Sequence, residues 1–166
     1  MRYPLLFAVA LALGRASTAF AAEPSAQPIR AMDALIGHWQ CDGVFPASGK
    51  TIASTMRFEA DLGGNAVLKH HDDISPPASY HAVEAWGYDA KAQRFNATIL
   101  DSFGGARRFS SDGWNGDTLT WTSAPELQPA QRFVYVRKDA STLTVDWDIM
   151  REGHFVVGDT LICKRQ

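Results

Sequence analysis

The feature that most constrains this chain is a series of short strand patterns, separated by turn-forming residues at intervals of roughly ten residues. The turns carry Gly, Pro, Asn and Asp, which favour tight reversals, and Asn115-Gly116 is the strongest hairpin signal. The only helical segment that we predict is short, Ala31–Ile36, and Gly37-His38-Trp39 follows it at the start of the first strand. Trp39 is expected to plug one end of the fold. The pattern predicts an all-β protein, a closed antiparallel up-and-down β-barrel of about ten strands with a short N-terminal helix.

The strand patterns also show which side chains share a face, because successive side chains of a strand point to opposite sides of a sheet. Residues 141–150 alternate cleanly, which places Val145 and Trp147 together on one apolar face. The predicted strands are His38–Phe45, Lys50–Ala60, Asn65–Ile74, Tyr80–Tyr88, Gln93–Asp101, Gly105–Ser111, Asp117–Ser123, Gln131–Lys138, Ser141–Met150 and His154–Lys164.

The hairpin over residues 65–88 carries the polar side chains of most interest. If Leu68 lies opposite Trp86, then His70 lies opposite Glu84, and the next hairpin brings Trp86 opposite residue 95. A slip of one residue in the pairing would reverse the inward and outward faces. With this register, the inward side chains are Leu68, His70, Glu84, Trp86, Phe95, Ala97 and Ile99.

A closed barrel of this size has room for a small ligand, and an apolar and aromatic lining with a few ionisable groups is typical of small-molecule pockets. The alternative is a filled core with one buried ion pair. Arg137, beside Tyr135, either clamps a carboxylate with two hydrogen bonds or lies at the rim with its head in water. The residues predicted to contact a ligand are Leu68, His70, Glu84, Trp86, Phe95, Tyr135, Arg137 and Trp147.

Two groups of ionisable residues could carry chemistry. His70 beside Glu84 could move a proton from a bound substrate, although a structural cross-strand pair explains the same residues. His71, Asp73 and His81 could form a surface metal site, but a polar face near a loop is the simpler interpretation. We therefore predict no metal site, leave the catalytic residues open, and favour a binding protein over an enzyme.

The N-terminal segment has the pattern of a secretory signal peptide. Arg2 supplies the positive charge, a short apolar stretch follows, and Ala19-Phe20-Ala21 is typical of a cleavage site. The apolar stretch is shorter than the roughly 20 residues that a membrane span needs. We predict a signal peptide at 1–22, a flexible tail at 23–30 and one barrel domain at 31–166. The mature protein is then periplasmic or secreted, with no membrane span.

Net charge and cysteine content further restrict the classes of partner and the cellular compartments that are compatible with the sequence. Removing residues 1–22 leaves 14 of the 16 Lys and Arg residues against 18 Asp and Glu, a net charge of −4. Mild acidity with scattered basic residues argues against nucleic acid as a partner. Cys41 and Cys163 lie near opposite ends of the mature chain, where a closed barrel brings first and last strands together. We predict a disulfide between them, with two buried free thiols as the alternative.

Several short motifs resemble a known group of proteins. They are Leu35-Ile36-Gly37-His38-Trp39, Gly87-Tyr88-Asp89, Asp101-Ser102-Phe103-Gly104-Gly105 and Asp112-Gly113-Trp114-Asn115-Gly116-Asp117. These motifs resemble an uncharacterised family of bacterial lipocalin-like barrels of the calycin superfamily, and this resemblance implies a β-barrel with no agreed activity. The opening Gly-x-Trp is also similar to the nitrobindins, which bind haem through a histidine. No histidine here matches that ligand, so we predict no cofactor.

These observations favour an exported β-barrel that binds a small, largely apolar molecule in its lumen. One alternative is a small enzyme, with an isomerase or hydrolase-like activity that uses His70 and Glu84. Another is a filled barrel whose loops contact an envelope protein. The sequence does not predict an oligomeric state.

Overall fold

The structure is a computed structural model, and it describes residues 28–75 and 78–166. The predicted signal peptide at 1–22, and residues 23–27 of the predicted tail, lie outside the described residues. The elements of the described chain are η1 (Pro28–Leu35), β1 (Gly37–Phe45), β2 (Lys50–Asp61), η2 (Leu62–Gly64), β3 (Ala66–Asp73), β4 (His81–Asp89), β5 (Arg94–Asp101), β6 (Ala106–Ser111), β7 (Trp114–Asn115), β8 (Thr118–Ser123), β9 (Gln131–Arg137), β10 (Thr142–Arg151) and β11 (His154–Arg165).

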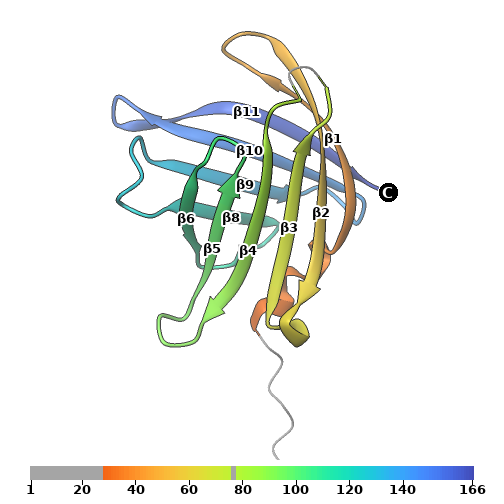
Figure 1. The fold of residues 1–166 in the computed structure, drawn as a ribbon, viewed down its shortest axis with the longest axis vertical. Coiled ribbons are helices and arrows are strands. Elements are labelled where there is room, and N and C mark those ends of the chain that lie inside the picture. Colours follow the sequence, from red (N-terminus) through yellow and green to blue (C-terminus); the bar gives the residue numbers. More distant parts are fainter. Residues whose placement is uncertain (1–27, 76–77) are drawn as a thin grey trace, which may run out of the picture.

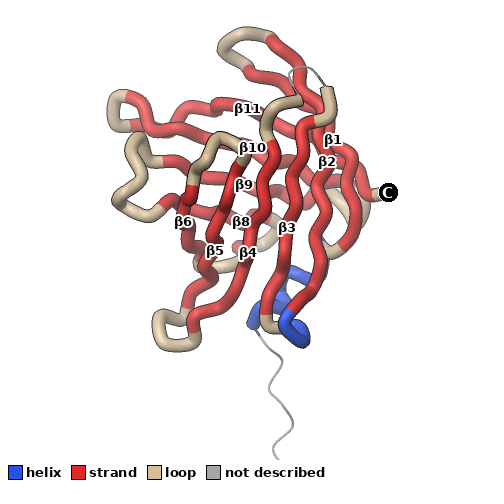
Figure 2. The backbone as a smooth tube through the Cα atoms, viewed as in Figure 1, coloured by secondary structure: helices blue, strands red, loops and turns tan. Residues whose placement is uncertain are grey.

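The strands form a closed antiparallel barrel (Figure 1). Neighbours in the chain pair with each other from β1 to β6 and from β8 to β11, as an up-and-down topology requires. Two further pairings close the ring, β1 with β11 and β6 with β8. The two-residue strand β7 pairs only with β8 among the described strands, so ten strands make the ring. The predicted fold class is therefore confirmed, and strand covers most of the described chain (Figure 2).

The hairpin predicted at Asn115-Gly116 forms, but its turn lies one residue later. Asn115 pairs with Thr118, so Gly116 and Asp117 are the two residues that reverse the chain. Gly116 has a φ of 59°, a conformation that glycine adopts without strain.

One end of the barrel is closed by η1 and Trp39. Ile29, Met32 and Leu35 of η1 are buried, and the indole nitrogen of Trp39 donates to the Leu35 carbonyl at 2.8 Å. The guanidinium of Arg165 lies 4.2 Å from the centre of the Trp39 ring. Trp39 thus plugs this end as predicted. The helix is a 3-10 helix that begins at Pro28, so residues 28–30 belong to it and not to the predicted tail.

An aromatic cluster fills the half of the barrel next to η1. Trp86 lies at its centre, with ring centroids 4.8 Å from Trp121, 5.5 Å from Phe58 and 5.8 Å from Tyr135. All four side chains are almost fully buried. Because aromatic pairs prefer such tilted or edge-on contacts, this half of the barrel has a well-packed core.

The predicted register of the β3–β4 hairpin is wrong by one residue. Trp86 lies opposite Val67, and Glu84 lies opposite Lys69. The inward face of β3 therefore carries Val67 and Lys69, while Leu68 and His70 lie on the outward face. Burying Lys69 is possible because Glu84 neutralises it, a compensation that alternation of apolar residues does not reveal.

The β4–β5 register differs by two residues from the prediction, which leaves the faces unchanged. Trp86 lies opposite Ala97 rather than opposite Phe95, and Glu84 lies opposite Ile99. Since a shift of two keeps the same side chains inward, all five of these residues are buried, as predicted.

Candidate functional site

A cavity of about 450 Å³ occupies the half of the barrel away from η1. Its lining includes Phe45 and Thr51 beside the β1–β2 turn, Tyr80 before β4, and Phe103 and Gly105 between β5 and β6. These connections lie at the end opposite η1 (Figure 1), so the cavity opens there. The lining residues are Phe45, Thr51, Ile52, Met56, Lys69, His71, Asp73, Ser79, Tyr80, Glu84, Asp101, Phe103, Gly105, Arg107, Phe133, Val145, Trp147, Asp159 and Leu161.

Trp147 forms part of the apolar wall of the cavity and is held by a bulge between β10 and β11. The pairing shifts between Trp147 and Asp148, which leaves Gly158 as the extra residue. A Cβ atom at Gly158 would lie 2.6 Å from the Trp147 ring, so the missing side chain lets the indole pack on the β11 backbone. The indole nitrogen donates to Gln131 Oε1 at 3.2 Å.

Lys69 and Glu84 form an ion pair at the inner end of the cavity. Lys69 Nζ lies 2.7 Å from Glu84 Oε1 and donates to the Tyr135 hydroxyl at 3.0 Å, while Trp86 Nε1 donates to Glu84 Oε2 at 2.8 Å. Burial alone lowers the pKa of Lys69, but the Glu84 carboxylate outweighs burial, and the pKa lies above its ordinary value. Burial raises the pKa of Tyr135 to about 12. Each charge therefore has a partner here.

Arg107 holds a second polar network near the mouth. Its guanidinium lies 3.1 Å from Asp101 Oδ2 and donates to the Tyr80 hydroxyl at 2.8 Å and to Gln131 Oε1 at 3.0 Å. Asp101 Oδ1 also accepts from the backbone N–H groups of Phe103 and Gly105, which shapes the β5–β6 loop. Asp101 neutralises Arg107, so this cation is already paired.

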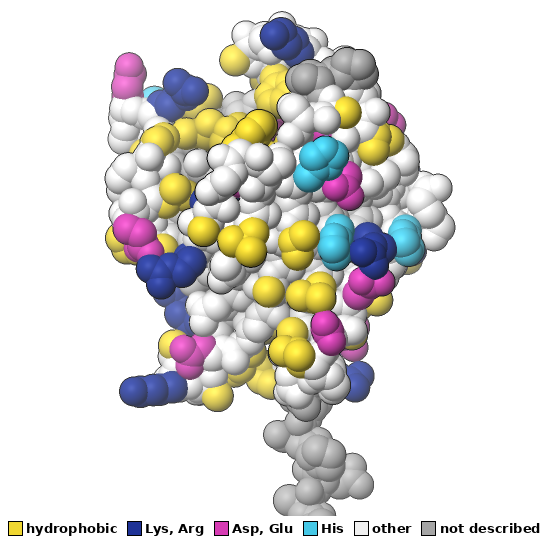
Figure 3. Space-filling view, in the orientation of Figure 1, with side chains coloured by type: hydrophobic (Ala, Val, Ile, Leu, Met, Phe, Trp, Pro, Cys, Tyr) yellow, Lys and Arg dark blue, Asp and Glu magenta, His cyan; other side chains and the backbone are white. Residues whose placement is uncertain are grey.

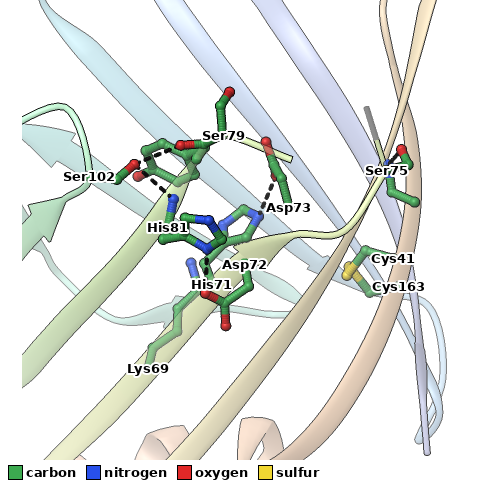
Figure 4. Close-up of polar contacts among 12 residues, drawn as sticks. Cys41, Lys69, His71, Asp72, Asp73, Ser75, Ser79, His81, Ser102 and Cys163 are labelled. Atoms are coloured by element: carbon green, nitrogen blue, oxygen red, sulfur yellow. Dashed lines mark hydrogen bonds and ion pairs between the residues drawn. A yellow bond between two sulfur atoms is a disulfide. The ribbon is translucent and has the colours of Figure 1, made fainter. Parts of the chain in front are cut away.

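His71 and Asp73 lie side by side on the inward face of β3 (Figure 4). His71 Nε2 and Asp73 Oδ1 are 3.7 Å apart, and both are buried without a hydrogen-bond partner. Burial, with the nearby Lys69 charge, holds the pKa of His71 well below its ordinary value. Burial also raises the pKa of Asp73. The imidazole is therefore neutral near neutral pH, and it does not balance the Asp73 charge.

Asp159 is a further carboxylate in the cavity wall. It lies on β11 opposite Trp147. Burial, together with the Asp73 and Asp146 carboxylates, raises the pKa of Asp159 from 3.8 to about 7. Among the described residues, no Lys or Arg side chain lies within ion-pair distance of Asp73 or Asp159. When they are ionised, these two carboxylates have no cationic side chain to neutralise them.

The predicted ligand-contacting residues divide between the cavity and other regions. Glu84 and Trp147 line the cavity, and Tyr135 lies directly behind Lys69. Trp86 and Phe95 belong to the packed core.

Three predicted site residues lie away from the cavity. Leu68 and His70 lie on the outward face of β3, opposite Ala85 and Val83. The His70–Glu84 pair predicted for acid–base chemistry therefore does not form. Arg137 pairs with Asp117 at 3.2 Å near the closed end.

The sequence prediction placed His71 and Asp73 on the outer surface as possible metal ligands, and it missed Lys69, Arg107 and Asp159. One signal could have identified the last of these. Asp159 alternates with Leu161 and Cys163, both of which are buried, and this spacing of two places it on the inward face of β11. Lys69, His71 and Asp73 required the correct β3 register.

The outward histidines do not join the cavity residues. His81 pairs with Asp72 at 2.9 Å, and both side chains are about half exposed (Figure 4). Histidine, acidic and basic side chains gather on this outer surface (Figure 3). Within residues 28–75 and 78–166, no group of three or more His, Cys, Asp or Glu side chains is arranged to hold a metal ion.

The predicted disulfide is present. Cys41 on β1 and Cys163 on β11 are paired directly in the register, both are fully buried, and the two positions have a sequence separation of 122. A disulfide is consistent with an oxidising compartment such as the periplasm. None of the helices in the described part of the chain has the length and apolar character needed to cross a membrane.

The closed ring and its cavity define the class of this protein, a ten-stranded antiparallel β-barrel with a ligand-sized cavity open at one end. The chain matches no protein-family model, and no curated protein matches its sequence. The lipocalin-like resemblance of its motifs therefore stays a prediction.

Proposed function

We propose that this protein is an exported β-barrel that binds a small, largely apolar molecule in its cavity. The observation that carries the proposal is the cavity itself. Its volume of about 450 Å³ falls within the range of roughly 300–1,000 Å³ that small-molecule pockets occupy. The apolar part of the lining is contributed by Phe45, Ile52, Met56, Phe103, Phe133, Val145, Trp147 and Leu161.

Two observations support export to the periplasm or the medium. The segment 1–22 has the pattern of a cleaved signal peptide, and the Cys41–Cys163 disulfide suits an oxidising compartment.

The proposal is tested by substituting a residue of the cavity wall with a larger one that fills the cavity. Ile52 is half-buried on β2 and lines the cavity, so Ile52→Trp places an indole in the space for the ligand. Overpacking typically costs about 1–3 kcal/mol, and thermal melting of the variant checks that the barrel is folded. The matched control is Val83→Trp, because Val83 is exposed on the outer face of β4.

Binding is measured by titration with the neutral fluorescent probe N-phenylnaphthylamine, and by native mass spectrometry of protein from a secreting host. We expect the wild type and Val83→Trp to bind the probe equally, and Ile52→Trp to bind it at least about tenfold more weakly. A wild type that neither binds the probe nor carries a co-purified molecule, or an Ile52→Trp variant that binds as well as the wild type, contradicts the proposal.

A further inference from the structure

The charges inside the cavity do not balance. Four carboxylates line it, from Asp73, Glu84, Asp101 and Asp159, together with two cationic side chains, Lys69 and Arg107. Lys69 is paired with Glu84, and Arg107 with Asp101. His71 contributes no positive charge near neutral pH, because burial lowers its pKa. With all four carboxylates ionised, the cavity carries two negative charges that no described residue neutralises.

The excess charge is concentrated on Asp73 and Asp159. Asp73 is only 7% exposed, and its Oδ1 atom has no hydrogen-bond partner. Asp159 lines the same cavity as Asp73, and the Asp73 charge contributes to the raised pKa of Asp159. A buried carboxylate oxygen without a partner is destabilising and is normally satisfied by a donor. A ligand that donates hydrogen bonds and carries positive charge would satisfy both carboxylates at once.

The rest of the cavity lining also favours a ligand that carries a cationic group. The cavity presents aromatic rings from Tyr80, Phe103, Phe133 and Trp147, whose faces attract cations. An anionic group would instead face two unmatched carboxylates, because both cationic side chains are already paired. A neutral ligand would leave the Asp73 oxygen without a charged donor.

We propose that the ligand is an amphipathic amine, with an apolar body in the cavity and one protonated nitrogen held between the carboxylates of Asp73 and Asp159. This inference rests on the proposed function, since it names the chemical class of the molecule that the cavity takes. The nitrogen donates hydrogen bonds to the two carboxylates, and the apolar body packs on the wall formed by Phe133, Trp147 and Leu161.

Binding of an amine then depends on pH. The charges that act on Asp159 are those of Asp73 and Lys69 on β3 and of Asp146 and Asp148 on β10. The other titratable groups that line the same cavity are His71 on β3, Tyr80 before β4, Glu84 on β4, Asp101 on β5 and Arg107 on β6. Asp159 loses its proton near pH 7, whereas an alkylamine stays protonated to about pH 10. Affinity for an amine therefore increases from pH 6 to pH 8, and affinity for a neutral ligand with the same body does not.

The test uses three ligands with one shared body, phenylbutylamine, phenylbutanol and phenylbutyrate. Each is titrated by calorimetry at pH 8 and pH 6 into the chain purified from a secreting host. The variants are Asp73→Asn and Asp159→Asn, which keep the shape of the side chain and remove its charge. Asp42→Asn is the matched control, because Asp42 is exposed on the outward face of β1. Thermal melting of each variant checks folding.

At pH 8 we expect the amine to bind at least about tenfold more tightly than the alcohol, and the acid to bind more weakly than either. Each cavity variant should lose the preference for the amine and keep its affinity for the alcohol, while Asp42→Asn behaves as the wild type. The inference is overturned if the acid binds as tightly as the amine, or if both cavity variants keep the preference. Equal binding of amine and alcohol overturns the inference and leaves the proposed function standing. If none of the three ligands binds, the inference is overturned, and the proposed function is overturned with it if the wild type also fails to bind N-phenylnaphthylamine and carries no co-purified molecule.

Discussion

At the scale of residues, the titration of Asp159 makes the stability of the folded protein depend on pH. Its pKa is raised from 3.8 in the unfolded chain to about 7 in the barrel, by burial first and then by Asp73 and Asp146. An acid whose pKa is raised by folding favours the folded state only while it is protonated, so stability falls as pH rises from about 4 to about 7. One pKa unit corresponds to about 1.4 kcal/mol, which sets an upper limit on the order of 4 kcal/mol for the loss.

Asp159→Asn removes this loss. We expect the free energy of unfolding in urea to exceed that of the wild type by up to about 4 kcal/mol at pH 8, and the difference to shrink at pH 5. The exposed Asp42→Asn should change stability little at either pH. An equal gain at both pH values would show that the charge of Asp159 is not the cause.

Lys69 is the residue whose removal leaves a charge without a partner. Lys69→Met should lower the free energy of unfolding by about 3–5 kcal/mol, because Glu84 then stays buried and unpaired. The double variant Lys69→Met/Glu84→Gln should recover part of the loss, since Gln can still accept from Trp86 Nε1. Chemical denaturation of both variants measures the difference. A double variant less stable than the single one would argue against this pair as a neutralised unit.

At the scale of elements, the strands were far easier to predict than their pairing. Each of the ten predicted strands begins and ends within one residue of an observed strand, because turn residues mark the ends. The β3 register was not predictable from alternation, since Val67 and Leu68 are both aliphatic and neighbouring positions repeat His-His and Asp-Asp. That one-residue error in the predicted register placed His70 on the inward face and turned Lys69, His71 and Asp73 outward, so most of the candidate site was missed.

The bulge between β10 and β11 positions Trp147 in the cavity wall. Gly158→Ala adds a Cβ atom 2.6 Å from the Trp147 ring and 3.1 Å from its carbonyl oxygen, which forces the indole to move. We expect a loss of about 1–3 kcal/mol in the free energy of unfolding and weaker binding of N-phenylnaphthylamine. Gly87→Ala on β4 is the matched control, because an added Cβ meets no atom within 4 Å there. Similar effects of the two substitutions would refute this role for Gly158.

At the scale of the whole molecule, the barrel closes through two unequal seams. The β6–β8 seam has two paired positions, Phe109 with Ser123 and Ser110 with Thr122. The β1–β11 seam has six paired positions and the disulfide. Closure was predictable because up-and-down topology brings first and last strands together, and the two cysteines lie on those strands. The unequal lengths of the two seams were not predictable, because the length of each pairing depends on the three-dimensional tilt of the strands.

The disulfide therefore joins the chain ends across the stronger seam, and it should contribute much of the stability of the barrel. It closes a loop of 122 residues, for which the chain-entropy model gives about 4–5 kcal/mol. The double variant Cys41→Ala/Cys163→Ala should lose about that much free energy of unfolding in a non-reducing buffer. In a reducing buffer the wild type should fall toward the variant, because the unfolded chain no longer carries the cross-link. A wild type that keeps its advantage after full reduction would mean that packing of the two buried sulfur atoms, rather than the covalent link, stabilises this seam.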